Sequence, residues 1–124
     1  MAKLLIVDDE LDVREFAASF FRKRKIKVTT AASGEEALQK IEEEKPELIL
    51  LDIKMPGIDG VQTLACIRDQ NKDIKVIMVT GRKPEEDTAF EKCRQLGALD
   101  YIHKPLELDE LEKIVLKEFN KNKS

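Results

Sequence analysis

Two stretches of acidic residues follow directly on short apolar runs of this sequence, and they are the first candidates for chemistry. Asp8, Asp9 and Glu10 follow residues 4–7, and Asp52 follows a second run. Carboxylates gathered in one place repel each other, so at least one would take up a proton unless a cation compensated the charge. Carboxylate oxygens are the ligands that Mg²⁺ prefers, and no His or Cys stands beside them to favour zinc. We therefore predict a magnesium site, with Glu10 alone expected to cap a helix or face solvent.

Two more polar residues occupy comparable positions. Thr80 follows the apolar run 76–79, and Lys104 lies just beyond the run 99–102. Ligands of parallel sheets gather beyond the carboxyl ends of the strands, so we expect both side chains to lie with the acids. Mg²⁺ and the Lys104 ammonium would together balance the three negative charges of Asp8, Asp9 and Asp52.

The elements that must position these residues alternate along the chain. Short apolar runs, mostly continuous, are typical of strands covered on both faces. They occupy residues 4–7, 26–30, 48–51, 76–79 and 99–102. Amphipathic segments with helical spacing separate them; one carries Val13, Phe16, Ala17, Phe20 and Phe21. The repeated strand–helix order predicts an α/β fold with a parallel sheet and right-handed crossovers.

Residues with strong positional preferences mark the predicted helix ends. Ser33 and Glu36 have the spacing of a capping box, and Asp59 stands where another helix opens. Pro84 suits the first turn of a helix, and Gly97 suits the left-handed cap at its end.

Length and composition limit the classes of protein to consider. The chain has 124 residues, a net charge of -3 and interspersed acids and bases, so we predict one domain over 1–124 with 121–124 as a tail or linker stub. This charge distribution favours neither nucleic acid nor a membrane as a direct partner. No apolar run resembles a signal peptide or a bilayer span, which predicts a cytoplasmic protein. Cys66 and Cys93 lack the spacing of a metal or redox pair, and we expect them to be small apolar fillers.

Four segments together resemble the signatures of the response-regulator receiver domain of two-component signalling. They are LLIVDDE at 4–10, LILLDIKMPGIDG at 48–60, VTG at 79–81 and DYIHKP at 100–105. Each motif alone is weak, but four in this order and at compatible spacing are strong. The resemblance covers essentially the whole chain, and it implies a doubly wound (βα)5, flavodoxin-like fold whose parallel strands have the order 2-1-3-4-5.

The resemblance also implies the function, a phospho-accepting signalling switch. Asp52 would take a phosphoryl group from a phosphohistidine of a sensor histidine kinase or phosphotransfer protein. Asp9 and Asp52 would hold Mg²⁺ directly, with the main-chain carbonyl of Lys54 as a third ligand and Asp8 acting mainly through water. The domain would catalyse only its own phosphorylation and dephosphorylation, so it would not be an enzyme in the usual sense.

Residues near the ends of the fourth and fifth predicted strands acquire roles from the same resemblance. Thr80 would hydrogen-bond one phosphoryl oxygen and Lys104 would pair with another. Tyr101 would turn inward when Thr80 moves, and Gly81 would leave the approach to phosphorus open. The bond between Lys104 and Pro105 would be cis. The change would be read by a downstream target protein or output domain at the face formed by the fourth helix, fifth strand and fifth helix.

Four further residues carry weaker expectations. Lys54 and Arg82 lie two positions beyond Asp52 and Thr80, where by resemblance they tune the loss of the phosphoryl group; they could equally be solvated surface cations. We expect His103 to be a solvent-facing loop residue. Phe90 lies one position off the inward face of its helix, so we expect it to be partly exposed.

Alternative functions remain open from the sequence alone. The chain could be a stand-alone, chemotaxis-type receiver or the receiver portion of a longer regulator with a DNA-binding or enzymatic output domain. A flavodoxin-like cofactor binder would share the fold, but clustered acids would repel a flavin phosphate. A phosphatase with an aspartate nucleophile would need a second acid where Lys54 stands.

Overall fold

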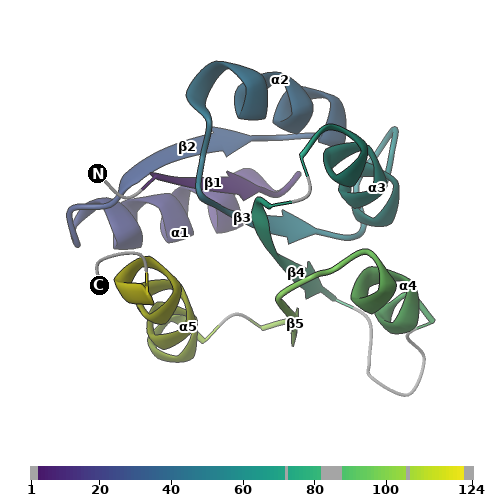
Figure 1. Ribbon diagram of the computed structural model, residues 1–124. Helices are drawn as coiled ribbons and strands as arrows, with labels where there is room; N and C mark the ends of the chain where they lie inside the picture. Colours follow the sequence, from purple (N-terminus) through teal and green to yellow (C-terminus); the bar gives the residue numbers. More distant parts are fainter. Residues whose placement is uncertain (1–2, 72, 82–87, 106, 122–124) are drawn as a thin grey trace.

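The computed structural model describes residues 3–71, 73–81, 88–105 and 107–121, along which strands and helices alternate (Figure 1). The strands are β1 (Lys3–Val7), β2 (Lys27–Ala31), β3 (Leu48–Asp52), β4 (Lys75–Thr80) and β5 (Asp100–His103). The helices are α1 (Leu11–Arg22), α2 (Gly34–Glu44), α3 (Gly60–Gln70), α4 (Phe90–Gln95) and α5 (Leu108–Lys121). Among the described residues no helix has the length and apolar character needed to cross a membrane.

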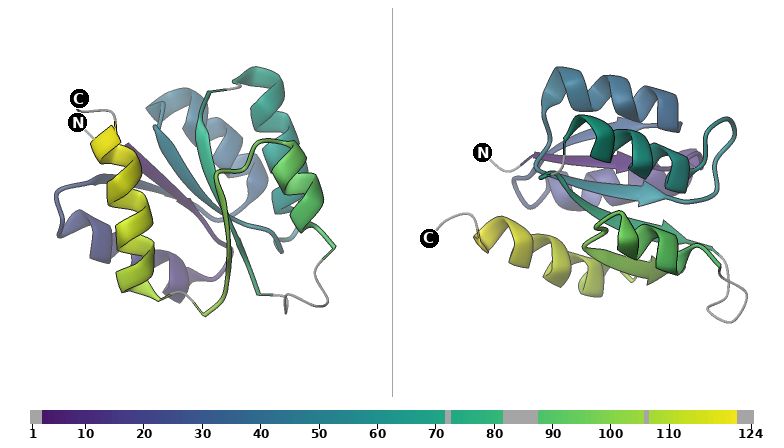
Figure 2. Two further views of the ribbon diagram at one scale, coloured as in Figure 1. Left: turned by 60° about the horizontal axis from the view of Figure 1, so that its bottom comes forward. Right: turned by 45° about the vertical axis from the view of Figure 1, so that its right-hand side comes forward.

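The strands form one parallel sheet in the order β2-β1-β3-β4-β5, which confirms the predicted α/β fold and strand order. Helices α1 and α5 pack on one face of this sheet, and α2, α3 and α4 pack on the other (Figure 2). Because β1 lies between β2 and β3, the residues that follow β1 and β3 meet at one edge of the sheet.

Burial on both faces explains why the strands are continuous apolar runs. In β1, Leu4 and Ile6 join the core beneath α1 and α5, whereas Leu5 and Val7 join the core beneath α2 and α3. Successive side chains of a strand point to opposite faces, so a sheet covered on both sides requires an apolar residue at every position.

Helices α2 and α3 both begin with a side-chain N-cap. The Ser33 hydroxyl accepts a hydrogen bond from the amide of Glu36 at 3.1 Å, as predicted. The Glu36 carboxylate accepts from the amide of Ala32 at 2.6 Å, one residue before the cap. Asp59 and Gln62 form a complete reciprocal capping box at the start of α3. These hydrogen bonds define the first turn of α3, the helix that follows β3.

The C-terminal end of α4 is held by a side chain from α3. Gly97 has a φ of 80°, the left-handed conformation that the sequence predicts there. Arg68 donates to the carbonyls of Leu96 at 2.6 Å, Gly97 at 3.0 Å and Ile74 at 2.6 Å. One guanidinium thus ties α3, the turn before β5 and the approach to β4. Pro84, predicted to open this helix, lies outside the described residues.

The remaining differences from the sequence-based expectation are small. Strands β2 and β5 each begin one residue later than the apolar pattern predicts. Ile26 stands just before β2 and is still buried in the core, which is why it belongs to the pattern without belonging to the strand. Both cysteines are free: Cys93 is buried and Cys66 is partly buried, as expected of helix residues that fill space.

Candidate functional site

The carboxyl ends of three neighbouring strands bring the predicted site residues together. Val7 pairs with Leu51 in the sheet, so the next residues, Asp8 and Asp52, lie side by side and are each only 4% exposed. Thr80 ends β4 and is also buried. The amide of Lys104 donates to the carbonyl of Thr80 at 2.7 Å, which brings the chain after β5 to the same edge.

Lys104 is the centre of this charged group. Its Nζ atom lies 3.3 Å from Oδ2 of Asp8, 3.3 Å from Oδ2 of Asp52 and 3.7 Å from Oε1 of Glu10. The bond between Lys104 and Pro105 is cis, as the resemblance implies. A single ammonium is therefore shared by carboxylates from two strand ends.

One ammonium does not neutralise these carboxylates. Burial, and then the neighbouring charge of Asp8, raise the pKa of Asp52 to about 6, although Lys104 acts in the opposite direction. Burial alone would lower the pKa of Lys104, but Asp52 and Asp8 outweigh it, so this pKa lies above its ordinary value. The site therefore holds excess negative charge near neutral pH.

Asp9 and Glu10 extend the acidic group toward solvent. Asp8, Asp9 and Glu10 each offer an oxygen, and these atoms lie within 4.8 Å of one another. Asp52 is not a member of that compact cluster, but it faces the same cavity as Asp9. This cavity of about 390 Å³ is lined by Asp9, Glu10, Asp52, Lys54, Gly81 and Lys104.

The donor set of the cavity fits a hard divalent cation. Its ligating side chains are carboxylates, and their charge exceeds that of Lys104, which is the chemistry Mg²⁺ requires. No His or Cys lines the cavity among the described residues, so zinc has no preferred ligand there. Glu10 adds a fourth carboxylate to the three in the predicted charge balance, leaving one negative charge on a mostly exposed side chain.

Glu10 faces solvent, which was one of its two expected roles, but it also takes part in the acidic group. It occupies the N-cap position of α1, as expected, but its side chain makes no capping hydrogen bond. Its carboxylate instead belongs to the acidic cluster and approaches Lys104. The available signal was its place directly after Asp8 and Asp9.

Gly60 allows the loop after Asp52 to close tightly. The amide of Ile53 donates to the carbonyl of Val79 at 2.9 Å, and the amide of Gly60 donates to the carbonyl of Ile53 at 2.6 Å. A Cβ atom on Gly60 would overlap the carbonyl oxygen of Asp52 and lie 2.5 Å from Cα of Ile53. Only glycine therefore fits at this point, which the sequence indicated merely as a helix start.

Of the two residues expected to tune the loss of the phosphoryl group, the structure describes only Lys54. The exposed side chain of Lys54 lines the cavity beside Asp52. Arg82 lies outside the described residues. Gly81 is exposed, and among the described residues the nearest atom to a Cβ placed there would be Cδ of Lys104 at 4.0 Å.

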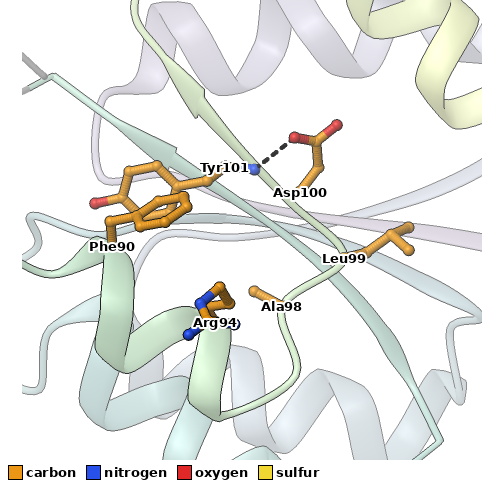
Figure 3. Close-up of a pocket in the computed structure, with 6 residues that line it drawn as sticks. All are labelled: Phe90, Arg94, Ala98, Leu99, Asp100 and Tyr101. Carbon is orange, nitrogen blue, oxygen red and sulfur yellow. Dashed lines mark hydrogen bonds between the residues drawn. The ribbon is translucent and has the colours of Figure 1, made fainter.

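A second cavity lies where α4 meets β5 (Figure 3). It has a volume of about 250 Å³ and is lined by Phe90, Arg94, Ala98, Leu99, Asp100 and Tyr101. Phe90 is 49% exposed, which confirms the prediction of partial exposure. The ring centroid of Tyr101 lies 5.2 Å from that of Phe90 and 5.4 Å from that of His103.

His103 was predicted to be a solvent-facing loop residue, and this prediction is wrong. It is the last residue of β5, pairs in register with Thr80, and is partly buried against Tyr101. The apolar pattern ended one residue early because His103 is polar. Its partial burial depends on the contact with the Tyr101 ring, which an apolar pattern does not predict.

A third cavity adjoins the acidic one. It has a volume of about 250 Å³ and is lined by Glu10, Val13, Phe16, Ala17, Lys104, Pro105 and Leu108. Glu10 and Lys104 line both cavities, so the two lie side by side. Phe16 lines this groove and is 67% exposed.

Comparison with known protein sequences identifies the family. The profile described as the response regulator receiver domain matches residues 4–116. Sporulation initiation phosphotransferase F of Bacillus subtilis (strain 168) is 36% identical over 115 residues, which cover 93% of this chain and 91% of that protein. The probable C4-dicarboxylate response regulator DctR of the same organism is 37% identical over 117 residues, but this chain spans only 51% of its length.

Solved structures agree. A CheY-like response regulator receiver domain protein from Methanospirillum hungatei JF-1 superposes with a TM-score of 0.88 at 34% identity, covering 99% of this chain and 98% of that one. Response regulator protein TrrA from Thermotoga maritima, in complex with Mg²⁺ and BeF, gives a TM-score of 0.80 at 35% identity, covering 94% and 98%. The parallel sheet, the buried aspartate at its carboxyl edge and these matches lead to one conclusion: the chain belongs to the response regulator receiver domain family, the phospho-accepting signalling domains of two-component systems.

Proposed function

We propose that Asp52 is the phosphoacceptor of this receiver domain and takes its phosphoryl group from a phosphohistidine of a sensor histidine kinase or phosphotransfer protein. A carboxylate oxygen of Asp52 forms the new P–O bond while the P–N bond of the donor breaks. The electron pair of that bond returns to the imidazole nitrogen, which takes up a proton. The observation that carries this proposal is a buried carboxylate at a cavity with a lysine ammonium 3.3 Å away.

The other residues of the cavity hold and neutralise the transferred group. Lys104 would exchange its contact with Asp52 for one with a phosphoryl oxygen, and Thr80 would hydrogen-bond another. Asp9, Asp52 and the main-chain carbonyl of Lys54 would hold Mg²⁺, with Asp8 acting mainly through water. The bound ion would offset the negative charge on the phosphoryl oxygens and the carboxylates.

Residues around the mouth of the cavity set how long the phosphoryl group remains. Gly81 is proposed to keep the approach to phosphorus open, because it carries no side chain and the nearest described atom to a Cβ placed there is Cδ of Lys104 at 4.0 Å. Lys54 and Arg82 are proposed to slow hydrolysis by contacting the anion or excluding the attacking water. By this mechanism the domain promotes its own phosphorylation and dephosphorylation.

The surroundings of the site favour a protein as phosphodonor. The groove beside Phe16 is apolar and shares Glu10 and Lys104 with the acidic cavity. A protein donor that delivers its phosphohistidine to Asp52 would cover this groove, where an apolar surface could bury the exposed Phe16 ring. We place this exchange in the cytoplasm, without direct contact to nucleic acid or membrane.

The output is proposed to be a change at the face of α4, β5 and α5, with Tyr101 as the moving ring. A downstream target protein or an output domain would read this face. Both forms occur in the family, since this chain spans 91% of one relative and 51% of another.

The decisive experiment is incubation with Mg²⁺ and acetyl phosphate, followed by intact-mass measurement. We expect a gain of one phosphoryl group that is labile to base and absent from Asp52→Asn. Asp69→Asn, which changes an exposed aspartate at the far end of α3, is the matched control and should behave as the wild type. A folded wild-type protein that gains no phosphoryl group would contradict the proposal.

A further inference from the structure

Three rings form a continuous column from α4 along β5. The Phe90 and Tyr101 rings meet edge to face, with centroids 5.2 Å apart and an interplanar angle of 82°. The Tyr101 and His103 rings meet at 5.4 Å and 64°. Figure 3 shows the Tyr101 ring beside that of Phe90 at the cavity between α4 and β5. Tyr101 is thus contacted by one ring from another helix and one from its own strand.

The fold explains why the column forms. Tyr101 and His103 are two positions apart on β5, so their side chains leave the same face of the strand. Phe90 is the first residue of α4, and the fully buried Cys93 one turn later fixes this helix against the sheet. The column therefore depends on packing that holds α4 in place.

The His103 end of the column is joined through the backbone to residues of the phosphoacceptor site. His103 pairs in register with Thr80, and the next residue, Lys104, donates its amide to the Thr80 carbonyl. A movement of Thr80 toward a phosphoryl group would therefore act directly on the end of β5 that carries His103. Tyr101 cannot change its ring position without altering the contacts with Phe90 and His103.

We propose that Phe90 and His103 are positioning residues that hold the Tyr101 ring in its unphosphorylated position and so set how readily the switch responds. This inference rests on the proposed function of Thr80 and Tyr101. An edge-to-face ring pair has an energy equivalent to roughly a two- to tenfold change in the ratio of two conformations. Loss of either ring should therefore shift the switch by roughly that factor toward its phosphorylated conformation.

The composition of the chain provides a direct readout. The sequence contains one Tyr and no Trp, so the intrinsic fluorescence of the full chain reports on Tyr101 alone. Acrylamide quenching measures the accessibility of this ring, with and without Mg²⁺ and beryllofluoride as the phosphoryl mimic. We expect beryllofluoride to change the quenching constant of the wild type.

The variants to compare are Phe90→Leu and His103→Leu. Without beryllofluoride, their quenching constants should already lie toward the wild-type liganded value. Their half-saturating beryllofluoride concentrations should be lower by roughly two- to tenfold. His103→Phe, which retains a ring, should restore wild-type behaviour. Phe20→Leu is the matched control, because it removes a ring that meets Phe21 edge to face on α1, away from Tyr101.

The failure of this inference can be told apart from that of the proposed function. Phosphoryl uptake by mass tests Asp52, and circular dichroism tests folding, independently of Tyr101. If wild type accepts phosphoryl but both leucine variants keep the wild-type quenching constant and beryllofluoride midpoint, the positioning role is refuted. It is equally refuted if beryllofluoride leaves wild-type quenching unchanged, or if Phe20→Leu shifts as far as Phe90→Leu.

Discussion

The Lys104 ammonium lies 3.3 Å from Oδ2 of Asp52, and the same nitrogen lies 3.3 Å from Oδ2 of Asp8. Burial, followed by the charge of Asp8, raises the pKa of Asp52 to about 6 even though this cation is in direct contact with it. Without Mg²⁺, the buried Asp52 carboxylate therefore lowers the free energy of unfolding, although its proposed role as phosphoacceptor requires it.

The first prediction concerns pH and stability without metal. The pKa of Asp52 is about 6 in the folded protein against an ordinary 3.8, so the folded state binds more protons between these values. The free energy of unfolding should therefore fall as pH rises from about 4 to 6, by up to roughly 3 kcal/mol from this group. Asp52→Asn should remove this contribution and be the more stable protein at pH 7, as measured by urea unfolding in EDTA.

Mg²⁺ provides the control for this measurement. Binding to the folded state alone should stabilise the wild type and leave Asp52→Asn less affected, because the variant has lost a proposed ligand. Equal stability of the two proteins at pH 7 in EDTA would show that the ionised Asp52 carboxylate does not destabilise the folded state.

The second prediction concerns Lys104. Among the described residues, Lys104→Gln removes the only cation within 4 Å of the carboxylate oxygens of Asp8 and Asp52. Phosphoryl uptake from acetyl phosphate should slow by roughly 10- to 100-fold, the range of a hydrogen bond to a charged group. Single-turnover mass measurements check the rate, with the exposed Lys113→Gln on α5 as control. An unchanged rate would exclude the proposed pairing of Lys104 with the phosphoryl group.

The third prediction concerns Gly60. A Cβ there overlaps the Asp52 carbonyl, so Gly60→Ala must displace either α3 or the end of β3. We expect destabilisation by roughly 1–3 kcal/mol, typical of overpacking, together with weaker Mg²⁺ binding in calorimetric titration. The displaced loop carries the Lys54 carbonyl, which is why affinity and not only stability should change.

Gly34→Ala separates these two effects. A Cβ on Gly34 would overlap Oγ1 of Thr63 and lie 2.6 Å from Cγ1 of Ile58, which are side-chain atoms between α2 and α3. This variant should lose stability but retain wild-type Mg²⁺ affinity once folded. If both alanine variants bind Mg²⁺ equally well, Gly60 has no positioning role at the site.

The fourth prediction concerns the groove beside the cavity. Phe16→Ala should lower kcat/KM for phosphoryl transfer from a phosphorylated histidine phosphotransfer protein by roughly fivefold or more, as expected of an interface aromatic. It should leave uptake from acetyl phosphate unchanged, because that donor does not reach Phe16. Leu99→Ala, at an exposed apolar residue 41% accessible near α4, is the control. A loss shared by both donors would point to a folding defect instead of docking.

The sequence was sufficient for those features that follow from strand periodicity. Continuous apolar runs locate the strands, and the residue after each run locates Asp8, Asp52 and Thr80 because parallel strands all end at one edge. The cis bond before Pro105 came from family resemblance, since nothing in the local composition demands it.

The features that escaped prediction depend on contacts between distant elements. Glu10 turns from capping toward Lys104 because a cation from the far end of the chain lies nearby. His103 is covered by a ring on its own strand, and Gly60 must be small because the Asp52 carbonyl lies against it. Periodicity predicts which face of an element a residue occupies, but not which residue of another element contacts it there.

The strand order also has a consequence for when the site exists during folding. Asp8 follows the first strand and Lys104 follows the last, and the two meet only because β3 and β4 stand in register between them. Such pairings between remote segments form late in folding, because the entropy cost of loop closure must be met before the contacts stabilise the chain. A nascent or clipped molecule that ends before Lys104 therefore lacks the ammonium that lies beside Asp8 and Asp52. Phosphoryl uptake at the full rate thus requires that the sheet is complete through β5.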